Sequence, residues 1–458
     1  MRIRQLLIKD LFNLFHHTVP FNLDEHITII HGANGFGKTT LLRLVNGLFN
    51  SLYSELETIP FSSLEIEFDN GNHLSIQKSI NKRRHKEGST GKKSGISFDY
   101  KTQSGKRESY HIDLESLLAR KIPLRHLEEE FRSFIPGLVR WNKNTWRFMP
   151  SGENLTSLDV LVRFQDQLPS GLREIYGELE AQPEWLTKVK QAINVHFIQT
   201  QRLVSIIDRP IRPGFRDPPT VTQAVEIYSN EIIELIKNTL AQYAELSQSL
   251  DRTFPERLVR QTQEEKLTSD QLRERLAALE RKQQGLQTTG LLEEERSVRF
   301  EMPDPIDTTT EKVLSVYVQD VENKLRVFDA FAAKVDLLRQ IIDSRFFYKK
   351  LALQREKGFF FISEDGQILS PTQLSSGEQN ELVLLYELLF KVKSGSLILI
   401  DEPEISFHVA WQQQFLKDLQ QIIRLSQFDV LIATHSPQII NDRWDLTVQL
   451  QGSLEQKK

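Results

Sequence analysis

Short apolar runs bounded by turn residues stand near both ends of the chain. Ile27–His31, Leu397–Ile400 and Val430–Ala433 are continuous apolar runs, which is typical of strands in a parallel sheet covered on both faces. Apolar and polar positions alternate over 64–68 and 74–80 on either side of an Asp-Asn-Gly-Asn turn, which predicts an antiparallel hairpin. Further strands are expected at Met1–Lys9, Val195–Ile198, Phe359–Ile362 and Gln367–Leu369, and a helix at Leu41–Phe49. The pattern predicts an α/β fold.

The middle of the chain has a helical pattern. Residues 114–190 are expected to be mainly helical, and 224–285 and 311–350 are long, polar and helical with leucines at heptad-compatible spacing. Pro303 and Pro305 lie between the two long segments, where a helix cannot continue. We interpret these segments as an antiparallel helical hairpin with a coiled-coil seam. An ordinary globular helical subdomain is the alternative.

Composition narrows the class of protein. The 458 residues suggest two or three domains, and 58 Lys and Arg against 62 Asp and Glu exclude a uniformly basic protein. No apolar run approaches the roughly 18 residues that a membrane helix needs, and the N-terminus lacks the pattern of a signal peptide. The chain has no cysteine, which excludes disulfides, thiolate zinc sites and cysteine nucleophiles and favours a cytoplasmic location.

One local stretch is strongly basic. Residues 78–107 carry many more basic than acidic side chains and are interrupted by glycines, so strands joined by loops are expected there. The residues that we expect to contact DNA or RNA are Lys82, Arg83, Arg84 and Lys86. A solvated, loop-rich surface is the alternative.

A phosphate-binding pattern follows the first apolar run. Residues 32–39 match G-x-x-x-x-G-K-[ST] between an expected strand and an expected helix. Glycines let the backbone N–H groups turn toward phosphates, and the helix directs its positive dipole end at the anion. Lys38 is expected to reach the β and γ phosphates of ATP, and the Thr39 hydroxyl to ligate Mg²⁺. The residues expected to bind the nucleotide are Asn34, Gly35, Gly37, Lys38, Thr39 and Thr40.

Three more segments carry polar groups that suit the same chemistry. Asp401 and Glu402 end the run 397–400, where catalytic groups gather in open parallel sheets. Asp401 is expected to hold the metal through water, and Glu402 to polarise the attacking water. His435 follows the run 430–433 and is expected to contact the γ-phosphate. The fourth segment precedes a helix and forms an expected anion site, comprising Ser375, Ser376, Gly377 and Glu378.

The order of these segments along the chain resembles an ABC-type ATPase head of the SMC, Rad50 and RecF branch. The segments are the phosphate loop, LSSGE (374–378), LILIDEP (397–403) and ATHS (433–436). That resemblance implies a head with a mixed or parallel sheet, an antiparallel lobe and a helical, coiled-coil-like insertion. The expected divisions are 1–205 and 351–458 for the head and 206–350 for the insertion. In that family the glutamate at the position of Glu402, directly after the aspartate at the strand end, is the catalytic base. The histidine at the position of His435 is the switch residue. A glutamine-bearing loop touches Mg²⁺, and Gln199 or Gln201 is the candidate.

The run from Asp401 onward is also similar to the ATPases of bacterial anti-phage systems, namely Septu (PtuA), PARIS (AriA) and the ATPase half of OLD nucleases. This resemblance implies a regulatory ATPase that forms a head-to-head homodimer or a higher oligomer. It also implies a separately encoded HNH or Toprim nuclease, or a toxin, as the effector subunit. A DNA-repair ATPase like RecF and a scaffold that binds nucleotide without turnover are the alternatives.

Overall fold

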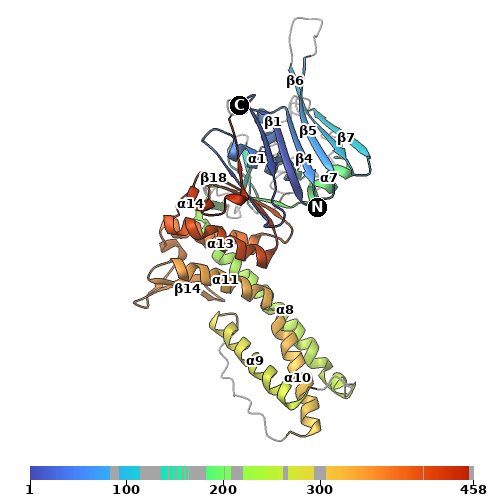
Figure 1. Cartoon of the computed structure of the whole chain (residues 1–458). Coiled ribbons are helices and arrows are strands. Elements are labelled where there is room, and N and C mark those ends of the chain that lie inside the picture. Colours follow the sequence, from blue (N-terminus) through green and yellow to red (C-terminus); the bar gives the residue numbers. More distant parts are fainter. Residues whose placement is uncertain are drawn as a thin grey trace, which may run out of the picture. The chain divides into compact units, whose positions relative to one another are not determined.

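The computed structural model describes residues 1–82, 92–113, 135, 137–142, 145–149, 152–156, 159–160, 163–164, 182–200, 202–207, 220–260, 267–292, 306–405 and 407–452. The chain forms two compact units, one made of Met1–Val221 with Lys391–Lys458 and the other of Thr222–Phe390 (Figure 1). The domain divisions after residues 205 and 350 stay predictions. Among the described helices, none is both long enough and apolar enough to cross a membrane.

A five-stranded parallel sheet lies in the first unit. Its strands, in spatial order, are β11 (Val195–Ile198), β17 (Leu397–Asp401), β18 (Asp429–Thr434), β3 (Ile27–His31) and β19 (Thr447–Gln449). Every neighbouring pair is parallel. The apolar runs predicted as strands are confirmed, because the residues of β17 are buried throughout and those of β18 are buried after the first. As a result, Asp401, Thr434 and His31 all end strands at the same edge.

The other large sheet of this unit is antiparallel and six-stranded. Its order is β2 (Phe15–Pro20), β1 (Ile3–Leu11), β4 (Ser63–Phe68), β5 (His73–Lys82), β6 (Lys92–Lys101) and β7 (Arg107–Asp113). The predicted hairpin over 64–80 is confirmed, with Ile66 opposite Leu74. This sheet is the antiparallel lobe that the family resemblance implied.

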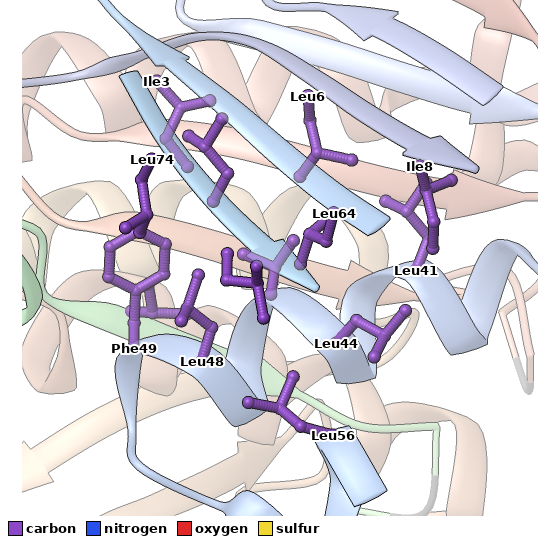
Figure 2. Close-up of a cluster of buried hydrophobic side chains, with 14 of the residues drawn as sticks. Ile3, Leu6, Ile8, Leu41, Leu44, Leu48, Phe49, Leu56, Leu64 and Leu74 are labelled. Carbon is purple, nitrogen blue, oxygen red and sulfur yellow. The ribbon is translucent and has the colours of Figure 1, made fainter. Parts of the chain in front are cut away.

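Helix α1 (Lys38–Phe49) packs against both sheets. Its leucines recur every three or four residues, and Figure 2 shows Leu41, Leu44 and Leu48 in one apolar cluster with Ile3 and Leu64 of the antiparallel sheet. The helix also contacts strands β11, β17 and β18 of the parallel sheet. Burial on two sides fixes the start of α1, and therefore the loop before it, relative to the strand ends. Two shorter helices, α2 (Tyr53–Thr58) and α7 (Glu184–Gln191), contact α1.

The prediction that 114–190 is mainly helical is wrong for its described middle part. Strands β8 (Leu138–Arg140), β9 (Thr145–Phe148) and β10 (Glu153–Thr156) form a small antiparallel sheet there. Gly137 and Gly152 adopt φ of 81° and 70°, which favour glycine and turn the chain. Residues 114–134 lie outside the described ranges.

The second unit is mainly helical, but its helices differ from the predicted two-armed hairpin. They are α8 (Ala224–Arg260), α9 (Ser269–Thr288), α10 (Thr308–Arg326), α11 (Asp329–Arg345) and α12 (Ser376–Tyr386). The segment predicted as one arm, 224–285, forms two helices, because Thr268 caps α9 in a reciprocal capping box with Gln271. The segment 311–350 is divided at Val327 and Phe328 and ends in a strand.

Side-chain pairs give the directions of the three long helices. Pairs between α8 and α10 run in opposite chain directions, whereas pairs between α9 and α10 run in the same direction. The former are Asp251–Lys324 and Arg257–Asp320, and the latter are Ser269–Glu311 and Arg275–Glu322. The predicted antiparallel pairing is therefore confirmed for α8 and α10, whereas α9 runs beside α10 in the same direction and does not continue the arm.

A three-stranded antiparallel sheet completes the second unit. It contains β14 (Lys349–Gln354), β15 (Gly358–Ser363) and β16 (Ile368–Leu369). β15 and β16 confirm the strands predicted there, whereas β14 begins inside a segment predicted to be helical. The chain then passes through a short 3₁₀ turn, Pro371–Gln373, into α12, so the LSSGE segment stands at a helix N-terminus as predicted.

Candidate nucleotide site

The phosphate loop joins β3 to α1 and depends on glycine at two places. Gly35 and Gly37 adopt φ of 85° and 87°, in the left-handed region. A Cβ on Gly37 would lie 2.6 Å from a methyl group of Leu11, so the buried Leu11 side chain would also have to shift. Asn34 and Gly35 are exposed at the tip of the loop, and Thr40 is partly buried in the first turn of α1. The backbone of the loop is therefore open to a ligand.

Lys38 lies inside this loop. Its Nζ donates to the carbonyl oxygens of Gly32 (2.9 Å) and Ala33 (3.2 Å) and lies 3.2 Å from Nδ1 of His435. The residue is 5% exposed, and burial lowers the pKa of its amine, although the nearby charges of Glu402 and Asp401 oppose that shift. An ammonium group with three donors, held by neutral carbonyls, suits phosphate oxygens as partners.

Two hydroxyls and a carboxylate meet beside the lysine. The hydroxyl of Thr39 donates to Oδ1 of Asp401 at 2.9 Å, and that of Thr200 lies 3.3 Å from Oδ2 of the same residue. Burial raises the pKa of Asp401, and the two hydroxyl donors oppose that shift. Hydroxyl and carboxylate oxygens are ligands that Mg²⁺ prefers, so the residues present fit this ion.

The donor set also fits the way in which Mg²⁺ binds. Mg²⁺ usually keeps several waters and takes one or two carboxylates together with phosphate oxygens of the substrate. Asp401 and Thr39 would hold the ion, which would neutralise phosphate charge.

The glutamine loop is placed in part. The register pairs Ile198 of β11 with Ile400 of β17, which brings Gln199 level with Asp401 at the edge of the sheet. Gln201 lies outside the described residues. Sequence reasoning missed Thr200, although a hydroxyl directly after a strand that neighbours the acidic strand is a signal for such a contact.

Glu402 and His435 approach each other at the ends of neighbouring strands. Oε1 of Glu402 lies 3.4 Å from Nε2 of His435, and both side chains are about a third exposed, at 28% and 32%. Glu402 has a φ of 45°, an unusual value for a residue with a side chain, and its N–H donates to the Ala433 carbonyl at 2.8 Å. Strained backbone of this kind is concentrated at functional sites.

The LSSGE segment belongs to the second unit. Ser375 caps α12 through a capping box with Glu378, and both serines are exposed while Gly377 is partly buried. Burial raises the pKa of Glu378, but hydrogen bonds from Lys349 and Ser375 outweigh it and leave the pKa below its ordinary value. Glu378 therefore serves this unit internally, and the exposed serines and helix N–H groups are the part open to a partner.

The structure leaves the expected nucleic-acid contacts untested. Arg83, Arg84 and Lys86 lie outside the described residues, and so does the side chain of Lys82 at the end of β5. Contact with DNA or RNA stays a prediction.

Comparison with known proteins assigns the family. The model of the family described as "AAA ATPase domain" matches residues 1–440. The chain belongs to this ATPase family. A curated relative, "Retron Ec83 probable ATPase" of Escherichia coli, is 26% identical to this AAA ATPase over 151 residues, which are 29% of the chain. The matched region spans about a quarter of that relative's length, 27%.

Solved SMC heads are similar over most of this AAA ATPase. One is the Smc head domain from Pyrococcus furiosus, solved with an extended coiled coil and bound to the C-terminal domain of ScpA. It is 13% identical, the match covers 100% of this chain and 97% of that chain, and the TM-score is 0.36. The SMC head domain from Thermotoga maritima is 10% identical, covers 96% and 91%, and has a TM-score of 0.31. Because TM-scores below 0.5 do not establish a shared fold, the fold assignment depends on the strand order and the family match.

Proposed function

We propose that this AAA ATPase binds and hydrolyses ATP and acts as the regulatory subunit of an anti-phage defence complex. The observation that supports hydrolysis is the meeting of four groups at one edge of the parallel sheet: the Lys38 ammonium, the Thr39–Asp401 pair, the Glu402 carboxylate and the His435 ring. Few other reactions need a phosphate loop, a magnesium-binding pair and a base at once.

Each residue then has a distinct role. Lys38 neutralises the β and γ phosphates, and Thr39 and Asp401 would hold Mg²⁺. Glu402 accepts a proton from the attacking water, while His435, 3.4 Å from that carboxylate, contacts the γ-phosphate and fixes the position of the base. Gln199, level with Asp401, is the remaining candidate for a water or metal contact.

The test of nucleotide binding is Lys38→Ala. Backbone N–H groups alone do not replace an ammonium at the β and γ phosphates, so ATP affinity measured by calorimetry should fall at least tenfold, or about 1.4 kcal/mol. Asp442→Asn, which changes an exposed acid on the turn after helix α14 (Pro437–Ile440), is the control and should bind ATP like the wild type. Equal affinity of the wild type and Lys38→Ala would reject the phosphate-loop assignment.

We also propose a head-to-head homodimer. One chain carries one phosphate loop and one LSSGE segment with exposed serines, so two copies could complete two nucleotide sites in a self-complementary arrangement. ATP would then strengthen the dimer by mass action. Ser375→Arg should leave nucleotide binding intact and remove the ATP-dependent gain in mass seen by light scattering. A wild-type protein that stays monomeric at micromolar concentration with saturating ATP would contradict the dimer.

The defence role is supported by the similarity to the retron ATPase and by the resemblance of the segment after Asp401 to anti-phage ATPases. The expected partner is a separately encoded HNH or Toprim nuclease or a toxin, and the expected location is the cytoplasm. Phage should form plaques less efficiently on cells that carry the gene with its neighbouring genes than on cells that carry the same genes with Lys38→Ala. Equal plating, together with sensitivity to DNA damage when the gene is deleted, would favour the repair alternative.

A further inference from the structure

Glu404 lies two residues after Glu402 but faces the neighbouring strand. Its Oε1 accepts three hydrogen bonds from the end of β18 and the loop after it: from Oγ1 of Thr434 (2.8 Å), N–H of His435 (2.8 Å) and N–H of Ser436 (3.1 Å). One carboxylate oxygen therefore holds three consecutive residues.

The local backbone directs Glu404 to this place. A turn closes when the N–H of Ile405 donates to the carbonyl of Glu402 at 3.2 Å, directly after the residue with positive φ. Gln412 of helix α13 (Val409–Ser426) supports the same arrangement, because its Nε2 donates to the Phe407 carbonyl at 3.2 Å and its Oε1 accepts from Ser436 at 2.7 Å. The turn that carries Glu402 and the loop that carries His435 are thus joined by side chains.

The other oxygen of Glu404 gives a second observation. Oε2 is buried and has no hydrogen-bond partner among the described residues. A buried carboxylate oxygen without a partner costs free energy, so packing alone does not explain an acid at this position. None of the described hydrogen bonds of Glu404 goes to the phosphate loop or to Asp401.

We infer that Glu404 is a positioning residue, which fixes the backbone of His435 so that its ring lies between Lys38 and Glu402. The ring is 3.2 Å from the lysine and 3.4 Å from the glutamate, and a shift of about 1 Å in such a group can lower a rate by two orders of magnitude. This inference rests on the proposed ATPase activity. It concerns kcat more than nucleotide affinity, because the hydrogen bonds from Lys38 to the Gly32 and Ala33 carbonyls do not involve Glu404, although the negative charge of Glu404 favours the protonated form of Lys38.

Three variants separate geometry from charge. Glu404→Ala removes the acceptor, and Glu404→Asp keeps the charge but is one methylene too short to reach all three donors. Glu404→Gln keeps an oxygen at the same distance without the charge. We expect kcat for phosphate release from ATP to fall at least tenfold in the alanine and aspartate variants, and to stay within about threefold of the wild type in the glutamine variant. The calorimetric Kd for ATP should change less than twofold in Glu404→Asp, which keeps the charge near Lys38, and by a smaller factor than kcat in Glu404→Ala. Glu356→Ala, at an exposed hairpin position, is the control.

Amide hydrogen exchange gives a readout that does not need turnover. The N–H groups of His435 and Ser436 should exchange at least tenfold faster in Glu404→Asp than in the wild type, and at nearly the wild-type rate in Glu404→Gln. If the alanine variant does not fold, the comparison of Glu404→Asp with Glu404→Gln still tests the inference. Wild-type kcat in Glu404→Asp, or a glutamine variant as slow as the aspartate variant, would overturn the inference. A wild type without turnover would instead refute the proposed function, and exchange would then test the placement of His435 alone.

Discussion

A buried lysine makes the stability of the nucleotide-binding unit depend on pH. Lys190 of α7 is 7% exposed, and its Nζ donates to the hydroxyls of Tyr53 (2.7 Å) and Ser51 (3.0 Å) and lies 3.3 Å from Oε1 of Gln182. All three partners are neutral. Burial therefore lowers the pKa of Lys190 from 10.5 to about 7.

The sign of the effect follows from proton binding. Between about pH 7 and 10.5 the unfolded chain holds a proton on Lys190 that the folded chain has released, so stability rises with pH in this window. The slope is at most about 1.4 kcal/mol per pH unit, which gives up to about 2.7 kcal/mol between pH 7 and 9. Burial raises the pKa of Tyr53 above its usual 10, so the tyrosine titrates outside this interval.

The perturbation is Lys190→Met, which fills similar space without a titrating group. Urea unfolding followed by far-UV circular dichroism at pH 7, 8 and 9 gives the free energy of unfolding of both proteins. The difference, wild type minus variant, should rise steadily with pH, whereas Lys188→Met, whose side chain on the same helix is 71% exposed, should show no such trend. Parallel pH curves for the wild type and Lys190→Met would refute the reasoning.

Three further outcomes follow from contacts or charges described above. Nε2 of His17 lies 2.8 Å from the Phe36 carbonyl of the phosphate loop, and burial lowers the pKa of this histidine. Because this contact supports the loop, His17→Phe should weaken ATP binding severalfold in calorimetry, and an unchanged affinity would argue against that support. Thr268→Ala removes the capping box of α9 and should cost about 1 kcal/mol in urea unfolding; an unchanged midpoint would count against it. Replacing the four basic residues expected to contact nucleic acid with alanine should flatten the salt dependence of nucleic-acid binding. These residues are Lys82, Arg83, Arg84 and Lys86. An unchanged slope would assign them to a solvated surface.

Strands were predicted well where burial on both faces leaves a continuous apolar run. β3, β17 and β18 are such strands, and their parallel pairing brings Asp401 and His435 to the edge where the phosphate loop begins. β19 was missed because Thr-Val-Gln is short and mixed in polarity, and it is a strand only through its pairing with β3.

Helix direction was not predictable from spacing. Heptad-compatible leucines are equally consistent with a long arm and with a helix that reverses direction, and the capping box at Thr268 shows only where α9 begins. Site contacts made by Thr200 and Glu404 were missed for a related reason. Both act through neighbouring strands, and their partners become adjacent only when the sheet forms.

The most direct test of the central claim is the rate of phosphate release by Glu402→Gln at saturating ATP and Mg²⁺. If Glu402 is the base, the rate should fall by about two orders of magnitude or more, while the calorimetric affinity for ATP stays close to that of the wild type. Asp442→Asn provides the matched control. Hydrolysis by Glu402→Gln at the wild-type rate would contradict the assignment of this edge of the sheet as the catalytic site.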